Sequence, residues 1–163
     1  MAVRYFSLIV GFVYTLIGLL GFFPSLVTPS QTAAPEIMNL VGTGTTAGFG
    51  YLFGLLPVTV YTNIFNLTIG IIGIAGFLGT EQGARIFADA LAVWFGLITF
   101  LGLFPVANTL FGLMPLFGNN VWLHLATGVL AAYFGFARDN GRLQNDPDKA
   151  LTVEDPYGNT QFL

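Results

Sequence analysis

Hydrophobic residues gather into four long segments of this chain, and polar residues lie mainly between and after them. The segments cover about residues 4–23, 58–78, 84–104 and 121–137. An α-helix of about 20 residues rises roughly 30 Å, the thickness of the hydrocarbon core of a bilayer. The pattern therefore predicts an all-α integral membrane protein with four transmembrane helices. The first segment is longer than a signal-peptide core, so we interpret it as a retained helix.

The connections between the segments differ in length and character. Residues 24–50 are polar and rich in small residues, which predicts an outer loop; the strand and lysine of a phosphate-binding loop are missing. Residues 51–57 are apolar but too short to span a bilayer, so we expect an interfacial or re-entrant turn. Residues 138–163 are polar without helical or strand periodicity, so a cytoplasmic C-terminal tail is expected after a four-helix domain at 1–137.

All the basic residues fall on one side of the predicted bundle. Four spans place both termini on the same side, and the two long outer connections contain no lysine or arginine. Basic residues favour the cytoplasmic side of a membrane, so we expect cytoplasmic N- and C-termini. The basic residues are Arg4, Arg85, Arg138, Arg142 and Lys149.

Composition supports the membrane assignment. Hydrophobic residues make up 55% of the chain and charged residues 8%, against roughly 25% charged in soluble proteins. The lipid bilayer is therefore the first expected partner, since too few charges are present to cover the surface in water. The net charge of −3 argues against nucleic acid. The lack of cysteine excludes disulfides and thiolate metal sites.

A short motif occurs twice and predicts an internal repeat. Residues 52–57 read Leu-Phe-Gly-Leu-Leu-Pro, and residues 110–115 read Leu-Phe-Gly-Leu-Met-Pro, an offset of 58 residues. The offset continues into the following segments, where Asn66 corresponds to His124. Both copies have the same predicted orientation. The sequence thus predicts two helical hairpins that form a parallel repeat about an axis along the membrane normal.

The repeat singles out Asn66 and His124. Each precedes a glycine by four residues, Gly70 and Gly128, so each polar group shares a helix face with a small residue. We hypothesise that the two side chains meet across the axis and form a hydrogen bond. Alternatives for His124 are an axial ligand of a tetrapyrrole and a proton-transfer or pH-sensing role.

Three other features of the apolar segments suggest contacts. Gly70, Gly73 and Gly76 follow one face of the second segment, which is typical of close helix packing in membranes. Trp94 and Tyr14 lie near mid-span, where the polar atoms of their rings need partners. The available hydroxyl groups belong to Thr15, Thr99 and Thr127.

Charged residues occur at the start of the third segment. Glu81, Arg85 and Asp89 are spaced by four residues and share one helix face. We interpret them as an interfacial ladder of ion pairs. An alternative role for Asp89 is a proton-relay or ion-site carboxylate, because ionisable groups inside membranes are often functional.

The two motif copies and the segments around them resemble the DUF4383 family of small four-helix bacterial membrane proteins of unknown function. The resemblance covers residues 1–137 and is carried by the turn at 50–58, the Ala84-Arg85 pair and the stretch 108–125. It implies a four-helix architecture in a bacterial inner membrane, or a thylakoid membrane in a photosynthetic bacterium. Family members often carry x-His-Asn-x-x-His in the second helix, whereas this chain has Thr62, Asn63 and Asn66.

The expected function is a non-catalytic structural or regulatory subunit docked laterally on a larger membrane complex. The alternative is a small oligomeric transporter or channel lined by Asp89 or by the Asn66–His124 pair. We do not expect an enzyme, because the sequence has no Ser-His-Asp set, metal cluster or paired carboxylates within the spans. No cofactor is predicted; a tetrapyrrole, a carotenoid or a lipid is the alternative.

Overall fold

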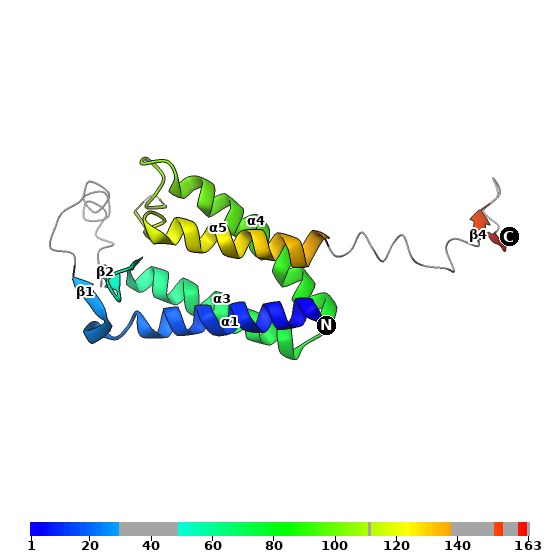
Figure 1. Ribbon diagram of the computed structural model, residues 1–163, viewed down its shortest axis with the longest axis horizontal. Helices are drawn as coiled ribbons and strands as arrows, with labels where there is room; N and C mark the ends of the chain where they lie inside the picture. The colour runs from blue at the N-terminus through cyan, green and yellow to red at the C-terminus, as the bar shows by residue number, and fades with distance from the viewer. Residues whose placement is uncertain (30–48, 111, 138–151, 155–159, 163) are drawn as a thin grey trace.

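The computed structural model describes residues 1–29, 49–110, 112–137, 152–154 and 160–162 (Figure 1). Most of the predicted 24–50 loop and much of the tail lie outside these residues. The described part contains four α-helices: α1 (Ala2–Leu20), α3 (Val60–Leu78), α4 (Glu81–Gly102) and α5 (Asn119–Ala132). The last of these continues directly into a π-helical turn, η2 (Tyr133–Ala137).

Three of these helices have the length and apolar composition to cross a membrane. They are α1, α3 and α4, with 19, 19 and 22 residues. The α-helical part of α5 has 14 residues, which rise about 21 Å and fall short of a core roughly 30 Å thick. The five residues of η2 lengthen this helical segment toward the predicted end at residue 137.

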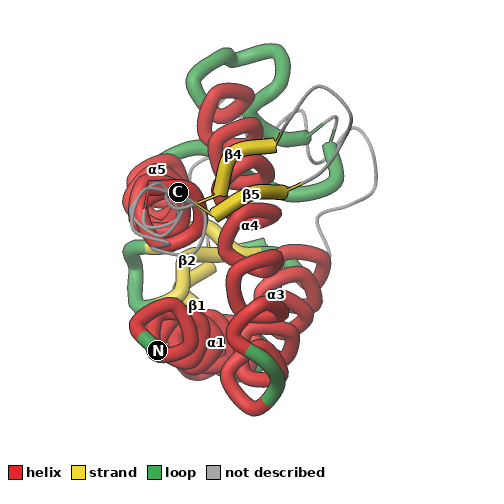
Figure 2. Tube along the Cα trace, turned by 90° about the vertical axis from the view of Figure 1, so that its right-hand side faces the viewer, coloured by secondary structure: helices red, strands yellow, loops and turns green. Residues whose placement is uncertain are grey.

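The helices form two packed pairs (Figures 1 and 2). Helix α1 packs along α3, and α4 packs along α5. Helix α4 also contacts both α1 and α3, so it joins the two pairs. Between the pairs lies a core of buried hydrophobic side chains, mainly from α1 and α4: Val3, Phe6, Val10, Tyr14, Phe87, Leu91, Phe95 and Ile98.

Glycines allow the close approach of α1 and α3. A Cβ on Gly73 would lie 2.7 Å from the Cα of Gly11, and a Cβ on Gly11 would lie 2.6 Å from the backbone nitrogen of Ile74. The Ser7 hydroxyl donates a 2.7 Å hydrogen bond to the Gly73 carbonyl. A Cβ on Gly76 would lie 2.6 Å from that hydroxyl. The two backbones are therefore too close for any larger residue at Gly11 or Gly73.

Threonine side chains mark where two of the helices begin. The Thr59 hydroxyl accepts a hydrogen bond from the backbone of Thr62 and caps α3. The Thr80 hydroxyl accepts from the backbone of Gly83 at 3.0 Å. This N-cap starts α4 at Glu81, three residues before the predicted start, because it satisfies a backbone donor of the first turn. Helix α1 ends at Leu20 rather than at residue 23.

Helix α5 is not capped by an asparagine, although asparagine is a favoured capping residue and two asparagines lie at its start. The capping residue is Gly118, whose φ of 62° favours glycine. Asn119 and Asn120 lie inside the first turn of the helix, and their side chains donate to the carbonyl groups of Leu55 and Pro57.

The segment expected as an interfacial or re-entrant turn, residues 51–57, forms most of a β-hairpin. Strands β1 (Val27–Pro29), β2 (Gly50–Leu52) and β3 (Leu56–Val58) form an antiparallel sheet. Phe53 and Gly54 have φ values of 51° and 71°, as a tight hairpin turn requires. The strands were not predicted, because three residues are too few to show a strand pattern. Two more unpredicted strands, β4 (Thr152–Glu154) and β5 (Thr160–Phe162), pair in the tail.

The two copies of the repeated motif have the same internal pattern of backbone hydrogen bonds. In the first copy the Gly54 and Leu55 nitrogens donate to the carbonyls of Tyr51 and Leu52, each at 3.0 Å. The pattern recurs 58 residues later. The Gly112 nitrogen donates to the Thr109 carbonyl at 2.9 Å, and the Leu113 nitrogen donates to the Leu110 carbonyl at 3.2 Å.

One side chain joins the ends of both copies. The Asn120 amide nitrogen donates to the carbonyl oxygens of Pro57 and Pro115, both at 2.8 Å. These prolines occupy the last position of each copy of the motif, and both are fully buried. Asn120 therefore fixes the two copies of the motif to each other and to the start of α5.

Candidate functional site

Phe95 of α4 lies at a point where all four helices contribute aromatic rings. Its side chain is fully buried. The ring stacks on Tyr14 of α1 at a centroid distance of 5.3 Å and on His124 of α5 at 5.0 Å. Phe65 of α3 lies tilted against the same ring at 6.4 Å. We call Phe95, Tyr14, Phe65 and His124 the aromatic cluster.

His124 is buried in this cluster, with 4% of its surface exposed. Its Nδ1 atom has no hydrogen-bond partner within the described part of the chain. Asn66 is also buried, in α3. The predicted hydrogen bond between Asn66 and His124 is not formed among the described residues. The reason is the packing: α3 lies along α1, α5 lies along α4, and Phe95 covers one face of the imidazole.

Tyr14 and Thr127 form a buried hydrogen bond at 3.1 Å. The Thr127 hydroxyl also donates to the Leu123 carbonyl at 2.8 Å. A hydroxyl has one hydrogen to donate, so the Tyr14 hydroxyl is the donor to Thr127. Of the threonines expected to serve mid-span rings, Thr15 bonds instead to the Gly11 carbonyl of its own helix.

A hollow of about 220 Å³ lies between α4 and α5, beside the aromatic cluster. Gly96 and Gly128 form part of its wall, and a Cβ on Gly96 would have no atom within 4 Å. His124 and Thr99 also line it. Thr99 is 7% exposed, and its hydroxyl has no partner in the described residues. We call this hollow the α4–α5 groove.

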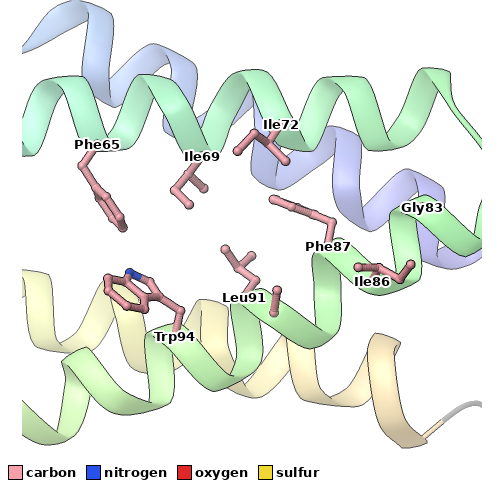
Figure 3. Close-up of a pocket in the computed structure, with 9 residues that line it drawn as sticks. Phe65, Ile69, Ile72, Gly83, Ile86, Phe87, Leu91 and Trp94 are labelled. Carbon is pink, nitrogen blue, oxygen red and sulfur yellow. The ribbon is translucent and has the colours of Figure 1, made fainter.

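A larger hollow of about 470 Å³ lies between α3 and α4 (Figure 3). Phe65, Ile69 and Ile72 line it from α3, opposite Phe87, Leu91 and Trp94 of α4. We call it the α3–α4 groove. The Trp94 side chain is 41% exposed here, and none of the hydrogen bonds of the described residues involves its indole nitrogen.

Asp89 lies in α4 beneath the π-helical turn. A Cβ on Gly135 of η2 would lie 3.1 Å from the Asp89 backbone nitrogen, so the turn packs directly on this part of α4. Arg85 and Asp89 are both half-buried, and neither is without a partner. Within the described residues no group of three or more histidine, cysteine, aspartate or glutamate side chains could hold a metal ion.

These features define a small helical protein with apolar helices of membrane-spanning length. The chain belongs to the family described as Domain of unknown function (DUF4383), whose sequence profile matches residues 4–137. The resemblance seen in the sequence is thereby confirmed, and the match ends before the polar tail. No curated protein and no solved structure matches the chain.

The sequence pointed to only some residues of these sites. His124 was conspicuous as the single histidine, and Trp94 as a tryptophan near mid-span. Phe95 and Phe65 had no signal, because the chain contains 17 phenylalanines and nothing distinguishes those two. Thr99 was considered as a partner for mid-span rings, but its place in the α4–α5 groove depends on helix rotation, which the sequence does not specify.

Proposed function

We propose that the protein is a non-catalytic structural or regulatory subunit that docks laterally on a larger complex in the bacterial inner membrane. The α3–α4 groove is the docking surface, and a transmembrane helix of the partner is the occupant. The observation that carries the proposal is Trp94, a half-exposed mid-span tryptophan with no indole hydrogen bond among the described residues.

The polarity of the indole favours a helix over a lipid chain. Trp94 lies 13 residues after the start of α4 at Glu81, or about 20 Å along the helix axis. At that depth an acyl chain offers no hydrogen-bond acceptor to an N–H group. A neighbouring helix can offer a serine or threonine hydroxyl, and such bonds hold helices together in membranes.

The shape of the groove also suits a helix. It runs along α4 from Gly83 to Trp94, about 16 Å, or roughly half of the hydrocarbon core. Gly83 and Ala90 lie on its α4 side, and small residues let the backbone of a partner approach. The large side chains at Ile72 and Phe87 leave the rest of the surface apolar (Figure 3).

The proposal includes four spans, arranged as two parallel-repeat hairpins with cytoplasmic termini. Support for the fourth span comes from the 19 residues between Asn119 and Ala137, α-helical and then π-helical. The recurrent turn hydrogen bonds and the bridge from Asn120 to Pro57 and Pro115 support the repeat. The positions of the basic residues support the orientation.

Site-specific photo-crosslinking tests the docking surface. A photoreactive residue at Ala90, which lines the groove, is expected to capture a membrane protein in cells. The same residue at Phe12, an exposed position on α1, serves as the control. Capture at Phe12 but not at Ala90, or at neither position, would overturn the proposal.

A matched pair of tryptophan variants tests the role of the indole. Trp94→Phe keeps the apolar ring and removes the N–H, so less partner should co-purify in mild detergent. Trp122→Phe removes another exposed tryptophan, near the start of α5, and should leave the complex intact. Equal recovery of partner with both variants would show that the indole does not contribute.

A transporter or channel is the second candidate, and the π-helical turn over Asp89 favours it. Such turns occur frequently at functional sites, and the backbone of Gly135 lies against Asp89. If this candidate is right, Asp89→Asn should abolish proton or solute flux in proteoliposomes, whereas Glu81→Gln at the start of the helix should not. Unchanged flux through the Asp89→Asn variant, or no flux through the unmodified protein, would reject the transporter or channel candidate.

A further inference from the structure

We infer that the α4–α5 groove binds an uncharged amphiphile, a slender apolar chain that ends in a hydroxyl group. The inference concerns a different face of α4 from the proposed docking surface and stands independently of it. It rests on two buried polar atoms, His124 Nδ1 and Thr99 Oγ1, which have no hydrogen-bond partner among the described residues. Both residues line the same hollow.

Both polar side chains lie at the same end of the groove. Thr99 is three residues before the end of α4 at Gly102, and His124 is five residues after the start of α5 at Asn119. These helix ends meet on the side of the outer turns (Figure 1). The two groups therefore lie about 5 and 8 Å below that end of the bundle, where the head group of an amphiphile would reside.

The rest of the groove is apolar, and small residues form much of its wall. From the polar end it continues past Gly96 and Gly128 to Ala92 and Ala132. This is seven or eight residues along each helix, about 10–12 Å. Glycine and alanine leave room beside the helix backbones without offering a hydrogen bond. This surface suits a single apolar chain or a flat ring system better than a bulky branched group.

The polar pair specifies the chemistry of the head group. A neutral imidazole offers one donor and one acceptor, and a threonine hydroxyl offers both. A hydroxyl on the ligand can donate to one of these groups and accept from the other. The residues that line the groove carry no charge to pair with a carboxylate or an amine, and an unpaired buried ion is costly. An uncharged alcohol therefore fits best.

Photolabelling of the full chain in lipid nanodiscs tests the inference. The probe is a sixteen-carbon alcohol, a chain length chosen for solubility in the bilayer, with a photoreactive diazirine in the chain. Its comparators are the same chain without the hydroxyl and the same chain with a carboxylate. We expect saturable labelling of α4 and α5 peptides by the alcohol. Labelling should be about tenfold stronger than by the hydroxyl-free chain, because that chain cannot form the two hydrogen bonds to His124 and Thr99.

Two variants separate binding from a purely structural role. Gly96→Leu places a side chain in open space, so it should fold normally and block labelling. Thr99→Val is close in shape and removes the unpaired hydroxyl, so it should fold at least as well and still lose labelling. Val93→Leu changes an exposed residue of α4 outside the groove and should label normally.

Several results would overturn the inference. They are equal labelling by the alcohol and the hydroxyl-free chain, stronger labelling by the carboxylate, and unchanged labelling in folded Gly96→Leu or Thr99→Val. Circular dichroism and thermal unfolding of each variant establish that it is folded before its labelling is compared.

Discussion

The Tyr14 hydroxyl donates a 3.1 Å hydrogen bond to the Thr127 hydroxyl and so links α1 to α5. The two residues are 113 positions apart in the sequence. The bond lies beside Phe95, which stacks on the Tyr14 ring. A long-range polar contact of this kind fixes how the α1–α3 pair is rotated against the α4–α5 pair, which apolar packing alone specifies less strictly.

Removing this hydroxyl should destabilise the bundle by a modest amount. Tyr14→Phe keeps the ring against Phe95, and Thr127 keeps its bond to the Leu123 carbonyl, so no donor is left unpaired. We expect a loss of about 0.5–1.5 kcal/mol in the free energy of unfolding, measured by denaturation in mixed detergent micelles. Tyr5→Phe, at an exposed tyrosine of the same helix, should show no change.

Two glycine-to-alanine substitutions should have opposite effects. At Gly73 the added methyl would lie 2.7 Å from the Gly11 Cα, a backbone atom that cannot move aside without shifting the helix. We expect Gly73→Ala to lower the free energy of unfolding by about 1–3 kcal/mol. At Gly96 the methyl meets no atom within 4 Å, so Gly96→Ala should be neutral or stabilising, since alanine favours helix. Thermal unfolding followed by circular dichroism distinguishes these outcomes.

The positions of the helices could be predicted well from hydrophobic length, because the bilayer imposes a narrow range on each span. Their ends could be predicted less well. The Thr80 cap starts α4 three residues before the apolar segment begins, and Gly118 caps α5, which starts two residues before the fourth apolar segment. The first depends on one side-chain hydrogen bond and the second on a positive φ at a glycine, and the hydrophobic pattern encodes neither.

The contacts between helices were the least predictable feature. The repeat suggested that Asn66 and His124 face each other, but symmetry in sequence fixes only their heights along the helices. The rotation of α5 turns His124 onto Phe95 instead. The glycine face at Gly70 and Gly73 was easier to interpret, because small residues at regular spacing have few roles other than close packing.

Substitution of Asn120, which joins the two motif copies, should destabilise the protein strongly. Asn120→Ala removes both hydrogen bonds to the Pro57 and Pro115 carbonyls and leaves two buried acceptors unpaired. Each such acceptor costs about 1–3 kcal/mol, so we expect severe destabilisation and poor accumulation in membranes. Asn119→Ala removes one exposed bond, to the Leu55 carbonyl, and should be nearly silent. Similar denaturation midpoints for the two variants would contradict this role.

The stability that Arg4 contributes should depend on the geometry of its side chain as well as on its charge. Its Nε and Nη2 atoms donate to the Phe77 carbonyl at 3.0 and 2.6 Å, and the guanidinium lies 5.6 Å from the centre of the Phe77 ring. The acceptor is one of the last carbonyls of α3, which lack partners within the helix. Lysine cannot reproduce the fork. Arg4→Lys and Arg4→Gln should therefore lose similar stability; destabilisation by glutamine alone would show that only the charge matters.

The proposed orientation in the membrane can be tested cleanly, because the chain contains no cysteine. Leu55→Cys places a thiol at an exposed position of the first outer turn, and Gln82→Cys places one at an exposed position near the start of α4. If α3 crosses the membrane and the termini are cytoplasmic, Leu55 lies on the outer side and Gln82 on the cytoplasmic side. A membrane-impermeant maleimide should then label Leu55→Cys in intact spheroplasts and Gln82→Cys only after lysis. The reverse pattern would invert the topology. Labelling of both variants in intact spheroplasts would show that α3, the helix between the two positions, does not cross the membrane.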